Sequence, residues 1–365
     1  MLSDNCCRLC GHSHLEPALA LSNVPRNIQR LFCRDELDQD RSVDLDVLRC
    51  ARCGFVQIRP LLEDEYYDDY LMTTTHSRQM QEYQKRQATD FICRFTLQGQ
   101  SVHELGCGDG SYLEHLREAG AKATGIEPSR RFRELALARG FEVQDGYVSA
   151  SRSLPGGPYD AFVTRQVLEH VPDIEDFLQG IWHNLKPGAP GLVEVPSLEK
   201  ALLDHRYYDF FPDHVNYFSQ ATLRLALELN GFDVLETFQD MFDEYNIAII
   251  RRREAPDLSG IQHSVDVLGA DLRQLLHDQH HAGRRVAVWG AGGKGLSVLA
   301  EAGISEVDLL IDGDPHKIGL LTPVSQLEVR PPSELANQQF AAVIITAMAY
   351  RHEIERLLRE EFGFR

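Results

Sequence analysis

The feature that most constrains the fold is a glycine-rich run that follows an apolar segment. Residues 102–110 read V-H-E-L-G-C-G-D-G, and residues 111–116 continue as a predicted helix. Glycine has no Cβ and tolerates left-handed backbone, so this turn can bend tightly and let a ligand approach its amides. Seventeen residues after Gly110, the next predicted strand, 123–126, ends in Glu127. An acid at the tip of a second strand can accept both hydroxyls of a ribose, so the pattern predicts a nucleotide-type ligand.

The spacing E-x-G-x-G-x-G, followed by the ribose acid, resembles the S-adenosylmethionine (SAM) methyltransferases. The alternative is a glycine-rich turn that binds no ligand. Asp145 follows the third predicted strand, where the acid or its backbone would meet the adenine amine; the alternative is an ordinary turn residue. The expected cofactor-binding residues are Glu104, Gly106, Gly108, Gly110, Glu127, Asp145, Arg165 and Gln166.

Composition limits the class of protein. The 365 residues are 43% hydrophobic and 25% charged, which is typical of a soluble globular protein with two or three domains. We find neither an apolar stretch long enough for a membrane span nor a secretion signal, and we expect a cytoplasmic protein. The formal net charge is −18 without a sustained basic stripe, which argues against a nucleic acid polymer as substrate.

Two C-x-x-C pairs lie near the amino terminus, Cys7 with Cys10 and Cys50 with Cys53. Paired knuckles of this kind supply four thiolates that converge on one zinc ion. Cys6 could replace Cys7 only with a poorer spacing. Four thiolates leave zinc no open position, so we expect a structural zinc site, with four unpaired thiols as the alternative.

The pattern of elements predicts an α/β protein of three domains. A zinc-binding domain spans residues 1–75, a class I SAM-methyltransferase domain spans 76–253, and a second Rossmann-like domain spans 254–365. Strands and helices alternate in the middle domain, which predicts a doubly wound parallel sheet. Its last two predicted strands, 234–238 and 246–251, match the antiparallel hairpin that closes the sheet in SAM methyltransferases.

The third domain contains a second glycine-rich loop, R-V-A-V-W-G-A-G-G-K-G, and the strand after it ends in Asp312. Such a loop can hold phosphate on backbone amides at a helix N-terminus. The spacing alone is weak evidence for NAD, so the kind of nucleotide stays open. The expected substrate-binding residues are Glu194, at the rim of the middle domain, and Gly290, Gly292 and Lys294 in this loop.

Residues 207–218 contain six aromatic side chains, and His214 lies among them. A loop this rich in aromatic residues is seldom solvated, so His214 is a candidate general base. The alternative is a structural histidine that caps the following helix. Glu169 and His170 begin a helix just after the strand that ends near Arg165, at the carboxyl ends of the parallel strands, where ligands bind.

Several motifs occur together and in a fixed order. After the four cysteines come E-L-G-C-G-D-G, E-H-V at 169–171, E-V-P at 194–196, D-H-V-N-Y-F-S at 213–219, and finally G-A-G-G-K-G with D-P-H-K-I-G. This array resembles the three-domain, zinc-containing C-methyltransferases that act on nucleotide-linked ketodeoxysugars, over essentially the whole chain. The resemblance implies SAM and structural zinc as cofactors, a nucleotide-linked sugar as substrate, and methylation of a carbon beside a ketone.

The resemblance also implies catalytic roles. His214 occupies the position of the base proposed for the family, and His170 occupies the position of another active-site histidine of the family. The family's tyrosine in the first domain corresponds to Tyr70, with Tyr66 and Tyr67 as competitors.

One departure concerns the run before the base. The family has tyrosine-histidine-glutamate, whereas this chain has Phe211, Pro212 and Asp213. Phe211 cannot hydrogen-bond a developing enolate, so we expect His170, Tyr217 or Tyr70 to do so. Asp213 is expected to bind a hydroxyl or an amine of the substrate. The identity of the sugar, and even its class, stays open.

Three other functions remain open on this sequence. The first is an O- or N-methyltransferase for another small molecule, which the changed run before His214 would accommodate. The second is a dinucleotide-dependent enzyme that uses the loop between Gly290 and Asp312. The third is a non-catalytic scaffold, disfavoured because Glu104, Glu127 and the histidines are all present.

Overall fold

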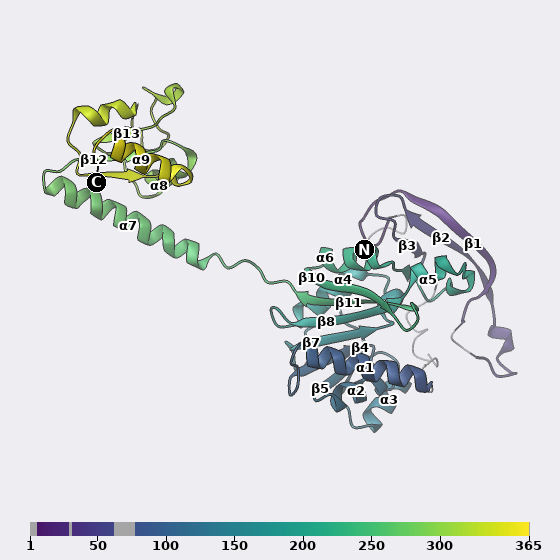
Figure 1. Cartoon of the computed structure of the whole chain (residues 1–365). Coiled ribbons are helices and arrows are strands. Elements are labelled where there is room, and N and C mark those ends of the chain that lie inside the picture. Colours follow the sequence, from purple (N-terminus) through teal and green to yellow (C-terminus); the bar gives the residue numbers. More distant parts are fainter. Residues whose placement is uncertain (1–5, 29–30, 62–76, 365) are drawn as a thin grey trace. The chain divides into compact units, whose positions relative to one another are not determined.

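The computed structural model describes residues 6–28, 31–61 and 77–364 (Figure 1). The chain forms two compact units, one that ends at Glu254 and one that begins at Ala255. Within the described ranges, no helix combines the length and apolar character needed to cross a membrane.

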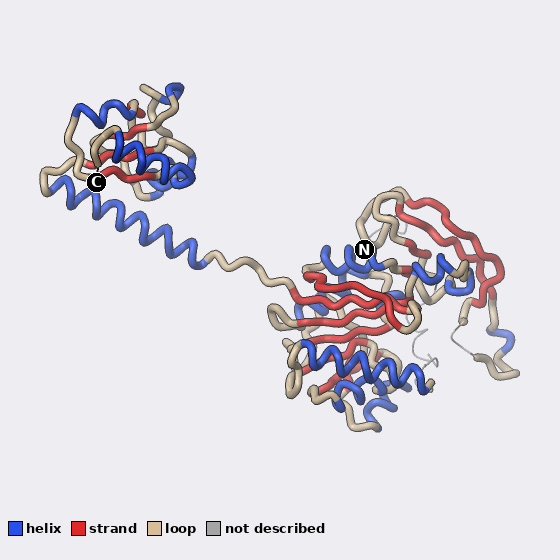
Figure 2. Tube along the Cα trace, in the orientation of Figure 1, coloured by secondary structure: helices blue, strands red, loops and turns tan. Residues whose placement is uncertain are grey.

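A seven-stranded sheet forms the centre of unit 1 (Figure 2). Its strands are β4 (Ser101–Leu105), β5 (Lys122–Glu127), β6 (Val143–Asp145), β7 (Ala161–Arg165), β8 (Pro190–Pro196), β10 (Phe232–Asp240) and β11 (Tyr245–Arg252). They lie in the order β10-β11-β8-β7-β4-β5-β6. The five strands from β8 to β6 are parallel, whereas β11 is antiparallel to both β8 and β10. The predicted parallel sheet and its closing hairpin are therefore confirmed.

Helices cover both faces of this sheet. They are α1 (Arg78–Arg94), α2 (Ser111–Glu118), α3 (Arg130–Ala138), α4 (Ile174–His183) and α6 (Gln220–Leu229). Helix α5 (Leu198–Leu203) packs through Leu198 with the smaller amino-terminal sheet instead. Phe91 of α1 and Leu116 of α2 pack in one core with Val102 of β4, and Ile181 of α4 packs in another with Phe162 of β7. Central strands buried on both faces are apolar throughout, and the first four residues of β7 are all buried.

A smaller antiparallel sheet lies at the amino-terminal end of unit 1. Its strands are β1 (Leu15–Pro25), β2 (Ser42–Cys50), β3 (Val56–Ile58) and β9 (Asn216–Tyr217), in that order across the sheet. The pairing of β3 with β9 joins residues far apart in sequence, since Val56 lies opposite Tyr217. Because β9 begins two residues after His214, this sheet helps to fix the position of the candidate base.

Unit 2 contains a four-stranded parallel sheet with helices α7 (Ser259–His281), α8 (Gly293–Glu301) and α9 (Arg351–Glu360). Its strands are β12 (Val286–Trp289), β13 (Leu309–Ile311), β14 (Val329–Arg330) and β15 (Ala342–Ile345), in the order β14-β13-β12-β15. The second glycine-rich loop connects β12 to α8. Its place between a parallel strand and the following helix is the one expected for a Rossmann-like unit.

Candidate active site

The first glycine-rich turn connects β4 to α2. Gly106, Gly108 and Gly110 have φ angles of 72°, 53° and 79°. A Cβ on Gly106 would lie 2.4 Å from the side chain of Val167, so no larger residue fits there. The amide of Gly108 donates a hydrogen bond to Oε2 of Glu127 at 2.8 Å. The acid at the end of β5 therefore supports the turn that a ligand would approach.

Two buried acids flank the turn. Glu127 also accepts a hydrogen bond from the Ser129 amide at 2.8 Å, and burial raises the pKa of its carboxyl. Glu104, at the end of β4, is 3% exposed, and its Oε2 has no hydrogen-bond partner among the residues that the structure describes. Burial raises the pKa of Glu104 well above its usual range. A buried acceptor without a partner is costly, so Glu104 fits a ligand that brings a donor.

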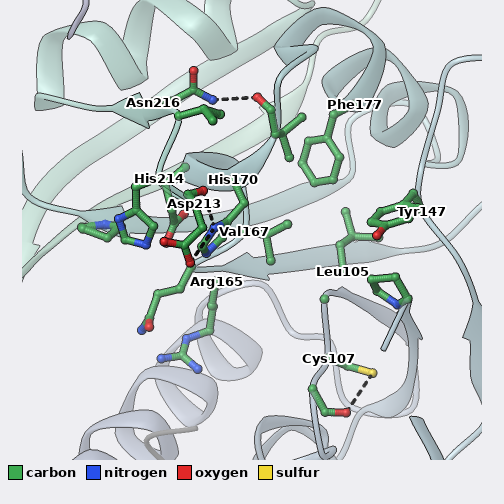
Figure 3. Close-up of a pocket in the computed structure, with 18 of the residues that line it drawn as sticks. Leu105, Cys107, Tyr147, Arg165, Val167, His170, Phe177, Asp213, His214 and Asn216 are labelled. Atoms are coloured by element: carbon green, nitrogen blue, oxygen red, sulfur yellow. Dashed lines mark hydrogen bonds and ion pairs between the residues drawn. The ribbon is translucent and has the colours of Figure 1, made fainter. Parts of the chain in front are cut away.

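A single cavity of about 820 Å³ joins the glycine turn to His214 (Figure 3). Tyr147 and Phe177 line it near the turn, and His170 and Asp213 line it beside His214. A ligand on the glycine turn and a second molecule near His214 would thus share one cavity. This arrangement suits transfer of a group between two bound molecules.

His170 and His214 lie edge to face, with ring centroids 4.6 Å apart. Nδ1 of His170 lies 2.9 Å from the backbone oxygen of Asp213, which can only accept, so Nδ1 carries the proton. Burial lowers the pKa of His170 to about 4. Burial, with the neighbouring His170, lowers the pKa of His214 well below its usual value. Both rings are therefore neutral near pH 7.

Backbone hydrogen bonds hold the segment around His214 in place. The hydroxyl of Tyr217 accepts from the amide of Phe211 at 3.1 Å and donates to the Phe211 oxygen at 3.2 Å. The side-chain amide of Asn216 donates to the oxygens of Leu168 and Val171, at 3.0 and 2.7 Å. Leu168 begins the short helix η3 (Leu168–His170) and Val171 follows it, so Asn216 ties His170 to the strand that follows His214.

The four predicted zinc ligands form one cluster in the amino-terminal region. Sγ of Cys7 lies 3.6 Å from that of Cys53, and Sγ of Cys10 lies 3.7 Å from that of Cys50. All four sulfurs lie within 4.8 Å of one another. Four thiolates at about 2.3 Å from a tetrahedral zinc would lie about 3.8 Å apart, so the cluster fits this ion. Cys6 does not belong to it.

Arg8 links this cluster to the active site. Its guanidinium donates to the backbone oxygen of Ile58, to that of Val215 at 3.0 Å, and to Oδ1 of Asn216 at 3.3 Å. Because Arg8 lies between Cys7 and Cys10, the conformation of this knuckle bears directly on the segment that carries His214.

The loop of unit 2 repeats the geometry of the first turn. Gly290 has a φ of 124°, and a Cβ there would lie 2.7 Å from Oγ1 of Thr346. Oδ2 of Asp312 accepts from the amide of Ala291 at 2.8 Å and from Nζ of Lys317 at 3.0 Å. Gly292 precedes α8 as its N-cap, and Lys294 is exposed in the first turn. The amides of this turn are thus placed at a helix N-terminus, where a phosphate binds favourably.

Comparisons with known proteins agree with this geometry. The family model described as a methyltransferase domain matches residues 80–237, and the model described as the C-methyltransferase C-terminal domain matches residues 252–362. The chain is a SAM-dependent methyltransferase. The predicted fold class, a class I SAM-methyltransferase fold, is confirmed by the strand order and by this match.

Three known proteins are similar to this methyltransferase over different shares of its chain. The C-methyltransferase NovU of Streptomyces niveus is 25% identical, over 95% of this chain and 90% of its own length. A ubiquinone biosynthesis O-methyltransferase of Bordetella avium is 33% identical over 26% of this chain and 41% of its own length. The structure of the PH0226 protein of Pyrococcus horikoshii aligns with 53% of this chain and 100% of its own, at 15% identity and a TM-score of 0.42. Homology over nearly the whole chain, with the matched C-terminal model, relates the methyltransferase to C-methyltransferases.

Glu194 differs from its predicted role in substrate binding. It is 1% exposed and lies outside the cavity lining. Its carboxylate accepts from the Tyr83 hydroxyl at 2.5 Å, from Gln87 at 2.7 Å, from Arg165 at 2.8 Å and from Gln166 at 3.1 Å. With four donors around it, Glu194 orients Arg165 and Gln166, which do line the cavity.

The side chain of Asp145 does not face the cavity, as expected of an ordinary turn residue, the alternative for this position. Its side chain is 72% exposed and forms an ion pair with Arg133 at 2.6 Å. The next residues, Gly146, Tyr147 and Val148, line the cavity instead. Sequence reasoning missed Tyr147 because an aromatic side chain after a strand carries no distinctive pattern, although its place after the third strand was a usable signal.

The structure thus brings together most of the predicted site. The cavity lining includes Glu104, Gly106, Gly108, Glu127, Arg165, Gln166, His170, Asp213, His214 and Tyr217. Gly110 lies behind the lining, where a Cβ would be 3.0 Å from Ala136. Tyr217, predicted as a donor to substrate, already donates to Phe211. Tyr70 and its competitors Tyr66 and Tyr67 lie outside the described residues.

Proposed function

We propose that this methyltransferase transfers the methyl group of SAM to a carbon beside the ketone of a nucleotide-linked deoxysugar. The observation that carries the proposal is the position of His214, a partly buried neutral imidazole that lines the same cavity as the glycine turn. The relation to the C-methyltransferase NovU over 95% of the chain supports a carbon acceptor.

His214 acts as the base in this proposal. A carbon beside a ketone is a weak acid, so its proton must be removed as negative charge moves to the ketone oxygen. A neutral imidazole can accept that proton, and a positioned base of this kind contributes about 10²–10⁴-fold to the rate. Contact with the Phe211 ring, at a centroid distance of 4.1 Å, and with His170 fixes the plane of the His214 ring.

The residues around the glycine turn fit SAM. Glu127 would accept the ribose hydroxyls, since each carboxylate oxygen retains a lone pair beyond its one amide hydrogen bond. Glu104 would receive a donor from the amino-acid part of the cofactor, and Tyr147 and Phe177 would contact the adenine. SAM supplies an electrophilic methyl group to the carbon that His214 deprotonates.

Replacing Glu127 by glutamine should weaken SAM binding about 10- to 100-fold. The new amide group would face the N–H of Gly108 or Ser129, and one acceptor for the ribose would be lost. Hydrogen bonds to a charged partner are worth about 1.5–3 kcal/mol, which corresponds to this range of Kd. Titration calorimetry with SAM measures the change. The matched control is Asp145→Asn, which should leave the Kd unchanged because Asp145 pairs with Arg133.

Unit 2 provides the binding site for the nucleotide part of the substrate in this proposal. The amides after Gly290 and Gly292 lie at the N-terminus of α8, and Lys294 adds a positive charge to the first turn. Backbone amides and a cation in this arrangement can donate hydrogen bonds to a diphosphate and offset its negative charge.

Replacing Lys294 by alanine should therefore raise the KM for a nucleoside-diphosphate-linked sugar about tenfold or more, with little effect on the Kd for SAM. Steady-state kinetics with the sugar varied at saturating SAM measures this. Arg356→Ala, which removes another exposed cation of unit 2, is the control and should behave as the wild type. An equal KM in both variants would contradict the role of this loop.

The four cysteines hold a structural zinc ion in this proposal, because four thiolates leave no position for a substrate. The ion would fix the knuckle that contains Arg8 and, through it, the segment with His214.

Exchange with solvent tests the proposed function directly. Incubation of the enzyme with a nucleoside-diphosphate-linked ketodeoxysugar in deuterium oxide, without SAM, should replace the hydrogen beside the ketone by deuterium. Mass spectrometry of the recovered sugar measures this. No exchange, combined with methylation of an oxygen or nitrogen when SAM is added, would favour an O- or N-methyltransferase instead.

A further inference from the structure

Glu169 is a buried carboxyl in the candidate active site and has none of the roles assigned in the proposed function. It lies in η3, is 1% exposed and belongs to the lining of the cavity. Neither of its carboxyl oxygens has a hydrogen-bond partner among the described residues. One of these oxygens and a ring nitrogen from each of His170 and His214 all lie within 4.8 Å of one another. Glu169 is thus adjacent to the place where the proposed reaction occurs.

The surroundings of Glu169 favour its protonated form. A bare carboxylate without a partner is very costly in a buried place. The charged and titratable groups that face it are the acids Glu194 and Asp213, the neutral rings of His170 and His214, and the hydroxyl of Tyr245. Burial first, and then the two acids, raise the pKa of Glu169 well above its usual range. The carboxyl therefore holds a proton near pH 7, and a protonated carboxyl is a hydrogen-bond donor.

The donors to the ketone oxygen that the sequence predicted are already engaged where the structure describes them. Phe211 has no hydroxyl, and the single hydroxyl proton of Tyr217 goes to the Phe211 oxygen. The Nδ1 proton of His170 goes to the Asp213 oxygen, so Nε2 of this neutral ring is an acceptor. A ketone oxygen that gains negative charge needs a donor, which typically contributes about 10²–10³-fold to kcat.

We infer that Glu169 is a catalytic residue that donates its carboxyl proton toward the ketone oxygen while His214 removes the proton from the neighbouring carbon. This inference rests on the proposed function. The electron pair of the broken C–H bond forms the C=C bond, and the carbonyl π electrons move to oxygen, which takes the proton of Glu169. The C=C electrons then form the new bond to the methyl carbon of SAM as its bond to sulfur breaks. The oxygen returns the proton to Glu169, and the proton on His214 passes to solvent.

The protonation state can be measured without any substrate. Infrared difference spectra between wild type and Glu169→Gln at neutral pH should show a carboxylic-acid carbonyl band that is present only in the wild type. Absence of that band would overturn the inference. A second metal ion per chain, beyond one for the four cysteines, would overturn it as well, because a cation among Glu169, His170 and His214 is the other way to neutralise this carboxyl.

Kinetics separate this inference from the proposed function. Glu169→Leu, which removes the donor at similar volume, should lower both kcat and the exchange rate about 10²–10³-fold, with the Kd for SAM unchanged. Glu169→Gln retains an N–H donor and should lose much less. The control is Glu175→Gln, an exposed acid in the first turn of α4. Full activity of Glu169→Leu would overturn the role of Glu169 alone, whereas a wild-type enzyme without exchange would overturn the proposed function.

Discussion

Replacing His214 by alanine should reduce both methyl transfer and solvent exchange of the substrate hydrogen about 10²–10⁴-fold, the range typical for loss of a general base. The Kd for SAM should stay unchanged, because His214 lies beside Asp213 and Phe211 and away from the glycine turn. Both reactions should fall by the same factor, since both need removal of the same proton. Exchange followed by mass spectrometry, and transfer followed with labelled SAM, measure the two rates.

The control for this variant is His183→Ala, which removes an exposed histidine at the end of α4. It should behave as the wild type. Because the pKa of His214 is lowered well below its usual value, the ring stays neutral at slightly acidic pH. The exchange rate should therefore change little between about pH 6 and pH 8, on either side of the ordinary histidine pKa. An unchanged rate in His214→Ala would refute the assignment of the base.

Replacing Cys50 by serine should remove the metal and destabilise the amino-terminal part of unit 1. Structural zinc contributes about 10–16 kcal/mol of apparent binding free energy in small zinc domains. Loss of the ion should therefore reduce the free energy of unfolding by more than most single substitutions do. The purified enzyme should contain one zinc ion per chain by elemental analysis, and the variant should contain much less. Activity should fall further than SAM affinity, because Arg8 and the β3–β9 pairing connect the cysteine cluster to the His214 segment.

Cys93→Ser is the control for the loss of a thiol, since Cys93 is exposed on α1. It should retain zinc, activity and melting temperature. A wild-type enzyme that is fully active without any metal would contradict the structural role of the cluster. So would a Cys50→Ser variant that binds zinc as tightly as the wild type.

Elements with a local pattern were predictable from the sequence. The turn with Gly106 and the acid Glu127 lie at fixed places in a βαβ unit, so their meeting follows from the fold class. The four cysteines were equally predictable, because each knuckle forms a tight turn of its own and only the joining of two knuckles is long-range.

The roles of Glu194 and Asp145 could not be predicted in this way. The position of Glu194 at a strand end indicates the rim of a site. Its carboxylate, however, accepts hydrogen bonds from Tyr83 and Gln87 of α1, which lie more than 100 residues earlier in the sequence. Asp145 turns toward Arg133, and nothing in the sequence marks that pair. The direction in which a side chain at the rim points depends on such hydrogen-bond and ion-pair partners. These partners come together only when the helices pack on the sheet.

The proposed role of Glu169 could not be predicted from the sequence either. The motif E-H-V indicates a functional role for the neighbouring histidine. No sequence pattern around Glu169 indicates whether its carboxyl is protonated. Its burial beside Asp213 and Glu194 indicates that it holds a proton, since neither carboxyl oxygen has a hydrogen-bond partner among the described residues.

In the proposed reaction, the acceptor atom is a carbon beside a ketone. The most direct test is to incubate the enzyme with SAM carrying a ¹³C-labelled methyl group and a nucleoside-diphosphate-linked ketodeoxysugar, and to locate the label by NMR. We expect the labelled methyl protons to correlate with the carbonyl carbon through one intervening carbon that has lost a hydrogen. A methyl signal typical of attachment to oxygen or nitrogen, with the hydrogens beside the ketone intact, would contradict the proposed reaction.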